Sequence, residues 1–136
     1  MRKTAQQMVD EALALVKTVS VDEAQRLQST GAQIVDLRDV RELEREGVVP
    51  GAFHAPRGML EFWVDPTCQY HHQAFTDSQK PYVLFCAMGW RSALAARTMQ
   101  EMGFSNVMHI DGGFTAWKIA GAPIAQKPVK TEKTQR

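Results

Sequence analysis

Three short apolar runs, over residues 33–37, 82–85 and 106–110, constrain the fold more than any other feature of the chain. They are rich in Val, Ile, Leu and aromatic residues, which is typical of strands buried on both faces. Longer segments with a helical pattern separate them. Strands that alternate with helices form a parallel sheet with helices on both faces. The sequence therefore predicts an α/β fold, a three-layer α/β/α domain with a small central parallel sheet.

Helices are predicted before, between and after these strands. The first covers residues 5–17, with an apolar face made of Met8, Ala12, Leu15 and Val16. Ser20 and Glu23 have the spacing of a capping box and predict a second helix over 21–29. A charged stretch over 38–46 follows the first strand. The remaining predicted helices are short ones within 58–75, a longer one over 91–102 and a last short one over 114–120.

Length and composition favour one globular domain, because the chain has 136 residues, 44% hydrophobic and 23% charged, and a formal net charge of +1. This balance gives no reason to expect a nucleic acid or a membrane surface as partner. A signal peptide and a membrane-spanning run are not recognised, so a cytoplasmic location is expected. The domain is predicted over 18–124, between a helical extension over 1–17 and a disordered polar tail over 125–136. The extension could cap the domain or pair with a second copy in a homodimer.

The two cysteines, Cys68 and Cys86, lie far apart in the sequence without a CxxC motif. Their spacing does not fit a zinc site, and a structural disulfide is not expected in a reducing compartment. Cys68 lies in an aromatic-rich segment and is interpreted as structural or merely exposed, with a resolving thiol as the alternative. The adjacent His71 and His72 point in different directions on regular structure and make a poor metal pair. His109, in the third predicted strand, is interpreted as a structural histidine, and no metal or cofactor is expected.

Cys86 differs from Cys68 because it lies between a predicted buried strand and the first turn of a predicted helix. The positive end of the helix dipole, the amides of the loop and the guanidinium of Arg91 would each favour the thiolate form of its side chain. Gly89 lets the loop turn tightly. A cysteine at a strand end is ordinarily a small buried hydrophobic residue. Here Gly89 and Arg91, at short spacing before the helix, indicate a reactive thiol instead.

Four stretches resemble the motifs of the rhodanese family, in that family's order and spacing. They are the D-x-R strand over 34–38, the P-G-A turn over 49–52, the active-site loop over 86–92 and the closing G-G-x-x-x-W and G-x-P signature over 112–123. Val48 is a departure, because the family often has a histidine at that position. Each motif alone is weak, but their combination is highly specific. The resemblance implies a rhodanese fold.

The resemblance also implies a two-step sulfur transfer in which Cys86 and Arg91 are the catalytic residues. The Cys86 thiolate would take a sulfur atom from a small sulfur donor such as thiosulfate or from a protein persulfide, and then hand it to a thiol or to cyanide. Asp36 and Arg38 match family positions and are interpreted chiefly as supporting scaffold, through a buried ion pair or a cap. The residues expected to hold the transferred sulfur are the other members of the loop, Ala87, Met88, Gly89, Trp90 and Ser92.

The length of the loop separates two activities known on this fold. Cys86 to Arg91 spans six residues, the length that the family associates with sulfur transfer. Related phosphatases have one residue more, which fits a tetrahedral phosphate. No acid is placed by a motif to protonate a leaving group. The alternatives are a cysteine phosphatase or arsenate reductase with the same loop, and a non-catalytic binding or redox module, in which the cysteine is commonly lost.

The side chains of the loop indicate a class of donor. Ala87, Met88 and Trp90 are uncharged and only Arg91 is basic. A small dianion such as thiosulfate would prefer more positive charge nearby. Met88 and Trp90 instead suggest an apolar rim that would suit a larger or protein-borne sulfur donor.

Overall fold

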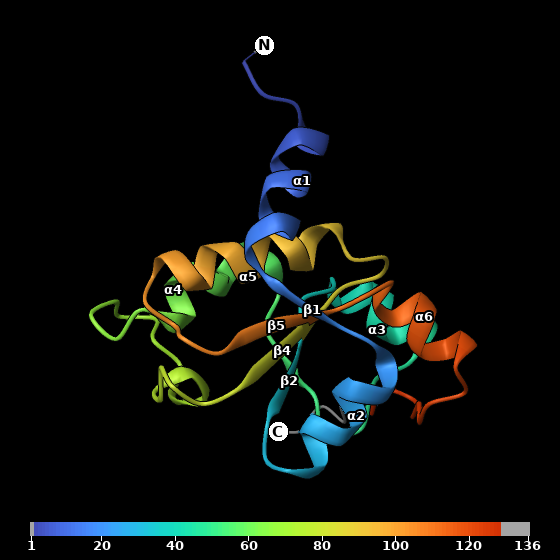
Figure 1. Cartoon of the computed structure of the whole chain (residues 1–136). Coiled ribbons are helices and arrows are strands. Elements are labelled where there is room, and N and C mark those ends of the chain that lie inside the picture. Colours follow the sequence, from blue (N-terminus) through green and yellow to red (C-terminus); the bar gives the residue numbers. More distant parts are fainter. Residues whose placement is uncertain (1, 129–136) are drawn as a thin grey trace.

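Five parallel strands form the central sheet, in the order β1-β5-β4-β2-β3 (Figure 1). The computed structural model describes residues 2–128. Within them, no helix is both long enough and apolar enough to cross a membrane. The elements in chain order are α1 (Ala5–Leu15), β1 (Lys17–Val19), α2 (Val21–Ser29), β2 (Gln33–Asp36), α3 (Val40–Glu46), β3 (Phe53–His54), the 3-10 turn η1 (Arg57–Met59), α4 (Leu60–Val64), the 3-10 turn η2 (Gln73–Phe75), β4 (Tyr82–Phe85), α5 (Trp90–Glu101), β5 (Val107–Ile110) and α6 (Gly113–Ile119).

The predicted three-layer α/β/α arrangement is confirmed. α4 and α5 cover one face of the sheet, and α2, α3 and α6 lie on the other (Figure 1). The three predicted strands are β2, β4 and β5, which are the inner strands of the sheet. Ala125 closes a backbone bridge with Val48. The part of the predicted disordered tail over 129–136 lies outside the described residues.

Three elements of the structure have no counterpart in the sequence prediction. The edge strands β1 and β3 have three and two residues, too few for a readable apolar run. α3 occupies the charged stretch, where Leu43 is its one buried residue and no apolar stripe forms. A capping box starts this helix, because the Glu42 side chain accepts a hydrogen bond from the Asp39 amide at 2.9 Å and the Asp39 side chain caps the helix in return.

α1 projects from the body of the molecule (Figure 1) and packs on α5 through Val9, Ala12 and Ala93. Its predicted apolar face is wrong in part. Met8 and Leu15 are 48% and 58% exposed, and Val9 is buried in their place. Only one side of α1 therefore contacts the domain, and the contact is narrow. The helix also ends at Leu15, earlier than predicted, because the chain must enter β1 and pair with β5.

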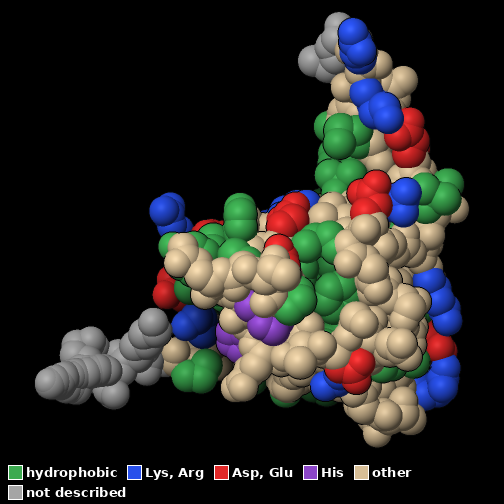
Figure 2. All heavy atoms as spheres, turned by 90° about the vertical axis from the view of Figure 1, so that its left-hand side faces the viewer, with side chains coloured by type: hydrophobic (Ala, Val, Ile, Leu, Met, Phe, Trp, Pro, Cys, Tyr) green, Lys and Arg blue, Asp and Glu red, His purple; other side chains and the backbone are tan. Residues whose placement is uncertain are grey.

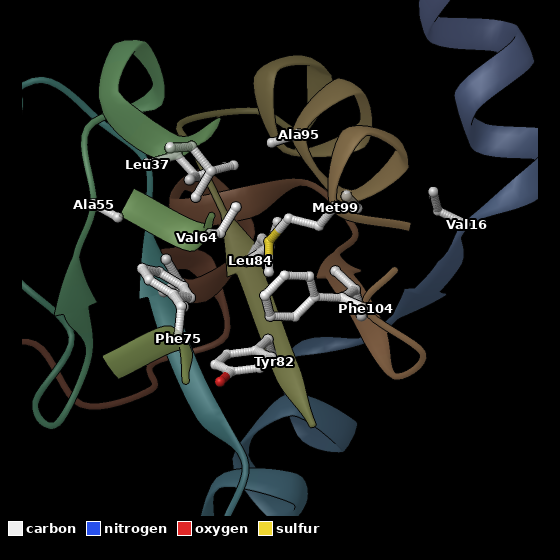
Figure 3. Close-up of a cluster of buried hydrophobic side chains, with 14 residues drawn as sticks. Val16, Leu37, Ala55, Val64, Phe75, Tyr82, Leu84, Ala95, Met99 and Phe104 are labelled. Atoms are coloured by element: carbon white, nitrogen blue, oxygen red, sulfur yellow. The ribbon is translucent and has the colours of Figure 1, made fainter. Parts of the chain in front are cut away.

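A core of aliphatic and aromatic side chains fills the space between the sheet and α5 (Figure 3). The Tyr82 ring of β4 packs between Phe75 and Phe104, with centroid distances of 5.5 and 5.7 Å. Its hydroxyl donates to the carbonyl oxygens of Ala74 and Asp77. β4 is therefore held firmly on this face. Because all strands are parallel, its carboxyl end lies at the sheet edge where such folds bind ligands.

Candidate active site

Cys86 directly follows β4 at this carboxyl edge and is 1% exposed. The Gly89 amide donates a hydrogen bond to its Sγ, with an N–S distance of 3.1 Å. The Oγ of Ser92 lies 3.7 Å from the same sulfur. The sulfur is therefore buried, but polar groups contact it and it is not sealed in hydrocarbon.

α6 fixes the backbone of the loop from behind. The Phe114 amide donates to the carbonyl oxygen of Cys86 at 2.8 Å, and the Thr115 amide donates to that of Ala87 at 3.0 Å. In a planar trans peptide, a carbonyl and the amide that follows it point in opposite directions. The amides of Ala87 and Met88 are therefore turned away from α6.

This close approach requires glycine at the start of α6. A Cβ on Gly113 would lie 2.4 Å from the carbonyl oxygen of Cys86 and 2.9 Å from that of Ala87. Real side chains do not approach backbone oxygens so closely. The second glycine of the G-G pair therefore allows α6 to hold the loop.

The N-terminus of α5 adds further polarity. Gly89 is its N-cap, with a φ of +112° that a glycine adopts readily, and no side chain caps the helix there. The first amides of a helix have no partner within the helix, and the helix dipole places partial positive charge at this end. An anion held next to the Cys86 sulfur would meet these donors.

Arg91, on the first turn of α5, forms a bidentate ion pair with Glu42 of α3. Its Nη1 and Nη2 donate to the two carboxylate oxygens at 2.8 and 2.9 Å. The hydrogen bonds from Arg91 lower the pKa of Glu42 to about 2. The pairing raises the pKa of Arg91, and the Cys86 side chain adds a smaller contribution in the same direction. The guanidinium lines the same cavity as the Cys86 side chain, but a carboxylate partly neutralises its charge.

A cavity of about 470 Å³ opens in front of the loop, lined by Cys86, Ala87, Met88, Trp90 and Arg91. Met88 is 71% exposed and Trp90 is 60% exposed. The two side chains that the sequence analysis assigns to an apolar rim therefore stand at the entrance. Most of the surface that a ligand would meet there is apolar.

The two remaining loop residues are not part of the cavity lining. Gly89 contributes its amide, as described above. Ser92 is completely buried and lies behind the sulfur, with its Oγ 3.3 Å from the Gly89 carbonyl oxygen and 2.9 Å from Nδ1 of His109. Ser92 is predicted among the substrate-binding residues, and its hydroxyl lies against the Cys86 sulfur.

Asp36 and Arg38 form a buried ion pair next to the site, with exposed fractions of 2% and 1%. The Nε and Nη2 of Arg38 donate to the two oxygens of Asp36 at 3.0 and 2.8 Å. The guanidinium also donates to the Gly47 carbonyl oxygen and lies 4.0 Å from the centre of the Phe114 ring. Arg38 therefore links the end of β2 to the helix that holds the loop.

Cys68 and His72 lie outside the cavity at Cys86 and in surroundings that differ from each other. Cys68 is half-buried, and the Tyr70 amide donates to its sulfur. His72 packs against the rings of Phe53 and Trp63. Histidine side chains form a small patch on the face shown in Figure 2. Within residues 2–128 no three metal-binding side chains gather in a group.

Two residues around the thiol, Glu42 and Thr18, are not predicted from the sequence, and His109 is predicted only as a structural histidine. The capping-box spacing of Asp39 and Glu42 was a signal for α3, although nothing local indicates Arg91 as a partner. His109 carried a weak signal, since it is a polar residue in an otherwise apolar strand. Its ring lies between Ser92 and Thr18, with Nε2 2.9 Å from the Thr18 Oγ1. Thr18 carried no signal, because it belongs to an unpredicted edge strand.

Comparisons with known proteins agree with this geometry. Residues 20–120 match the Rhodanese-like domain. The Thiosulfate sulfurtransferase GlpE of Shewanella oneidensis is 33% identical over 107 residues, which cover 78% of this chain and 96% of that protein. The solved polysulfide-sulfur transferase homodimer of Wolinella succinogenes is 27% identical, with a TM-score of 0.73, and the match covers 93% of this chain and 88% of the other.

A further solved structure comes from Rhodopseudomonas palustris and is described as a protein of unknown function and possible tyrosine phosphatase. It is 46% identical, with a TM-score of 0.87, and the match covers 92% of this chain and 96% of the other. The family match spans the strands, the loop and the closing G-G turn described above. The chain belongs to the rhodanese family.

Proposed function

We propose that the protein is a sulfurtransferase that carries a sulfane sulfur as a persulfide on Cys86. Its donor is thiosulfate or a persulfide, and its acceptor is a thiol or cyanide. Family membership and the similarity to GlpE proteins support a sulfurtransferase-type activity. The observation that carries the proposal is the loop from Cys86 to Arg91, in which a buried sulfur accepts a hydrogen bond from an amide and lines the same cavity as a guanidinium.

The loop from Cys86 to Arg91 can stabilise the negative charge that develops in this reaction. The Cys86 thiolate attacks the outer sulfur of thiosulfate, a new S–S bond forms, and sulfite leaves with the electrons of the broken S–S bond. The negative charge then rests on the outer sulfur of the persulfide. The amides of Ala87 and Met88, turned away from α6, and those of the first turn of α5 are the donors for it. The acceptor attacks the outer sulfur, and the Cys86 thiolate leaves.

The cavity entrance favours a large donor within this reaction. Met88 and Trp90 offer exposed apolar surface, and Glu42 offsets the charge of Arg91. A small dianion therefore gains little attraction, whereas a protein-borne persulfide would cover the apolar side chains. Second-order rate constants for thiosulfate and for a protein persulfide test this choice. We expect the protein persulfide to be faster, and a clear preference for thiosulfate would contradict it.

A tyrosine phosphatase is the second candidate, because the Rhodopseudomonas palustris relative is described as a possible one. Two observations weigh against it. The loop has six residues from Cys86 to Arg91, the shorter type. Glu42, the carboxylate bound to Arg91, has a pKa of about 2, so it is ionised at neutral pH and has no proton for a leaving group.

The test is sulfur loading. The protein is incubated with thiosulfate and analysed by mass spectrometry for one added sulfur atom, and cyanide is then added and thiocyanate measured. Cys86→Ser should lose both signals. Cys68→Ser is the matched control, since Cys68 lies outside the loop, and it should load like the unmodified chain.

A chromogenic phosphate ester is offered in parallel to the same three proteins. We expect negligible phosphate release. Phosphate release that depends on Cys86, without sulfur loading, would overturn the proposal in favour of the phosphatase.

A further inference from the structure

A continuous chain of polar side chains leads from the Cys86 sulfur across the sheet to the molecular surface. The Sγ of Cys86 lies 3.7 Å from the Oγ of Ser92, which lies 2.9 Å from Nδ1 of His109. The opposite ring nitrogen, Nε2, lies 2.9 Å from Oγ1 of Thr18. This row of side chains crosses three adjacent strands, because Cys86 follows β4, His109 belongs to β5 and Thr18 belongs to β1.

Burial changes sharply along this chain. Cys86, Ser92 and His109 are 1%, 0% and 2% exposed. Thr18, on the edge strand β1, is exposed to solvent. It is paired in register with His109 in the sheet, which brings its hydroxyl to the imidazole. The buried thiol therefore has a hydrogen-bonded route to water on the α1 side of the sheet, separate from the cavity lined by Met88 and Trp90.

The four side chains from Cys86 to Thr18 have two self-consistent hydrogen-bond patterns. With a Cys86 thiol, the S–H donates to Ser92, the Ser92 hydroxyl donates to Nδ1 of His109, and Nε2–H donates to Thr18. With a thiolate, every donor is reversed: Thr18 donates to Nε2, Nδ1–H donates to Ser92, and the Ser92 hydroxyl donates to the sulfur. A neutral imidazole serves both patterns because its two tautomers exchange donor and acceptor between the ring nitrogens.

We propose that Ser92, His109 and Thr18 form a proton path that ionises Cys86 and then holds the thiolate. The three are positioning residues, and the inference rests on Cys86 being the nucleophile of the proposed function. In the ionising step, the S–H proton passes to Ser92, the Ser92 proton to Nδ1, the Nε2 proton to Thr18 and the Thr18 hydroxyl proton to a solvent water. One proton leaves the protein, every hydroxyl is restored, and His109 changes tautomer without gaining charge.

The surroundings of His109 favour a neutral imidazole ring, which can pass a proton from one ring nitrogen's neighbour to the other's. Burial lowers the pKa of His109, while the charge of Asp111 acts in the opposite direction and only partly offsets it. The other charged groups at the near end of the path are the paired Arg91 and Glu42 beside Cys86. At the far end, Lys17 precedes Thr18 on β1 and is exposed. The single Ser92 hydroxyl proton has a competing acceptor in the Gly89 carbonyl oxygen, which lies 3.3 Å from the Oγ, farther than Nδ1 of His109 at 2.9 Å.

The test measures the reactivity of Cys86 without any sulfur donor. In a Cys68→Ser background, the rate of alkylation by iodoacetamide is recorded from about pH 5 to about pH 9. His109→Gln can still accept from one neighbour and donate to the other, but it has no second tautomer. We expect it to lower the rate at neutral pH about tenfold and to move the rise in rate about one unit toward alkaline pH. A purely structural histidine would leave the pH profile in place.

Variants of Thr18 should have a smaller effect on the alkylation rate than His109→Gln, because Thr18 is exposed to water. Thr18→Val should lower the rate about threefold, since water replaces part of the lost hydroxyl, and Thr18→Ser should restore it. Profiles of His109→Gln and Thr18→Val that coincide with that of the Cys68→Ser parent would overturn the proposal.

Nitrogen-15 NMR of the imidazole gives a readout on the otherwise unmodified chain, should a variant fail to fold. We expect the proton of His109 on Nε2 at the acidic end of the alkylation profile and on Nδ1 at the alkaline end. One tautomer throughout would refute the relay. Neither measurement uses thiosulfate, so a protein that fails to load sulfur can still pass this test, and the two proposals fail separately.

Discussion

Two strand ends lie side by side at the carboxyl edge of the sheet, yet they use their polar groups in opposite ways. Asp36 ends β2 and is paired in register with Phe85, which ends β4. After β2, the Asp36 carboxylate accepts from the Arg38 amide at 3.0 Å and binds the Arg38 guanidinium, so the junction is closed. After β4, α6 binds the carbonyls of the loop and leaves its amides turned outward.

The comparison shows how one fold separates scaffold from site. Backbone amides at both junctions are potential anion donors. At the end of β2 a carboxylate of the chain itself occupies that role, and burial of the pair excludes other anions. At the end of β4 the next residue is Cys86 with its small thiol, and a cavity lies in front of it. The end of β4, where no carboxylate of the protein occupies the amides, is therefore the junction at which an external anionic group can bind.

The largest effect should come from opening the closed junction. Arg38→Met leaves the Asp36 carboxylate buried without its partner, and we expect a loss of about 3–5 kcal/mol in the free energy of unfolding. Urea denaturation measures it. The double variant Asp36→Leu with Arg38→Met removes the stranded charge and should recover most of the stability. A double variant no more stable than Arg38→Met would contradict this account of the junction.

A smaller effect is expected from disturbing the open loop. In Gly113→Ala the new Cβ meets the Cys86 carbonyl oxygen at 2.4 Å, so α6 must move away. We expect a loss of about 1–3 kcal/mol in stability and at least about a tenfold loss in sulfurtransferase kcat/KM, because the loop amides lose their orientation.

Gly103→Ala is the matched control for this variant. It also places a Cβ at a positive φ, +105°, but no atom lies within 4 Å of it. It should cost about 1 kcal/mol through backbone strain and leave kcat/KM unchanged. Equal losses of activity in the two variants would mean that stability, and not the anchoring of the loop, controls the rate.

The inner strands and the loop are predicted well from the sequence, whereas the edge strands are not. The inner strands are buried on both faces, so the runs of β2, β4 and β5 are readable from composition alone. The loop from Cys86 to Arg91 is contiguous, and its strand-to-helix setting follows from local pattern. β1 and β3 pair at the edges over a few residues, and their positions depend on the rest of the sheet.

The partners of the loop were harder to predict because they come from distant segments. Glu42 reaches Arg91 from α3, 49 residues away in the chain, and Thr18 reaches His109 over 91 residues. Single-sequence patterns do not contain such pairings. Ser92 is predicted among the substrate-binding residues because it belongs to the loop motif, and in the structure it is completely buried with its Oγ 3.7 Å from the Cys86 sulfur.

The ion pair between Glu42 and Arg91 joins the helices that follow the two junctions, α3 and α5. The pKa of Glu42 is depressed from 4.5 to about 2, so its contribution to stability is present above pH 4.5 and is lost as the pH falls toward 2. We expect Glu42→Gln to cost about 1 kcal/mol at neutral pH, a small value because the Arg91 side chain is 40% exposed. Thermal unfolding across this pH range should show the difference from the unmodified chain shrinking. A constant difference down to pH 2 would exclude this linkage.

The smallest effect should come from the rim of the open loop. Trp90 is 60% exposed and contributes to the cavity wall, so Trp90→Gln removes apolar contact surface without disturbing the core. Truncating an aromatic contact at an interface costs about 1 kcal/mol, which corresponds to about a fivefold loss in kcat/KM for a protein persulfide. Thiosulfate is too small to span the rim, so its rate should change less than about twofold. Ile119→Gln, on the exposed side of α6 and 82% exposed, is the matched control and should alter neither rate. If Trp90→Gln slows thiosulfate as much as the protein donor, the indole acts on the loop itself, and the rim has no part in choosing the donor.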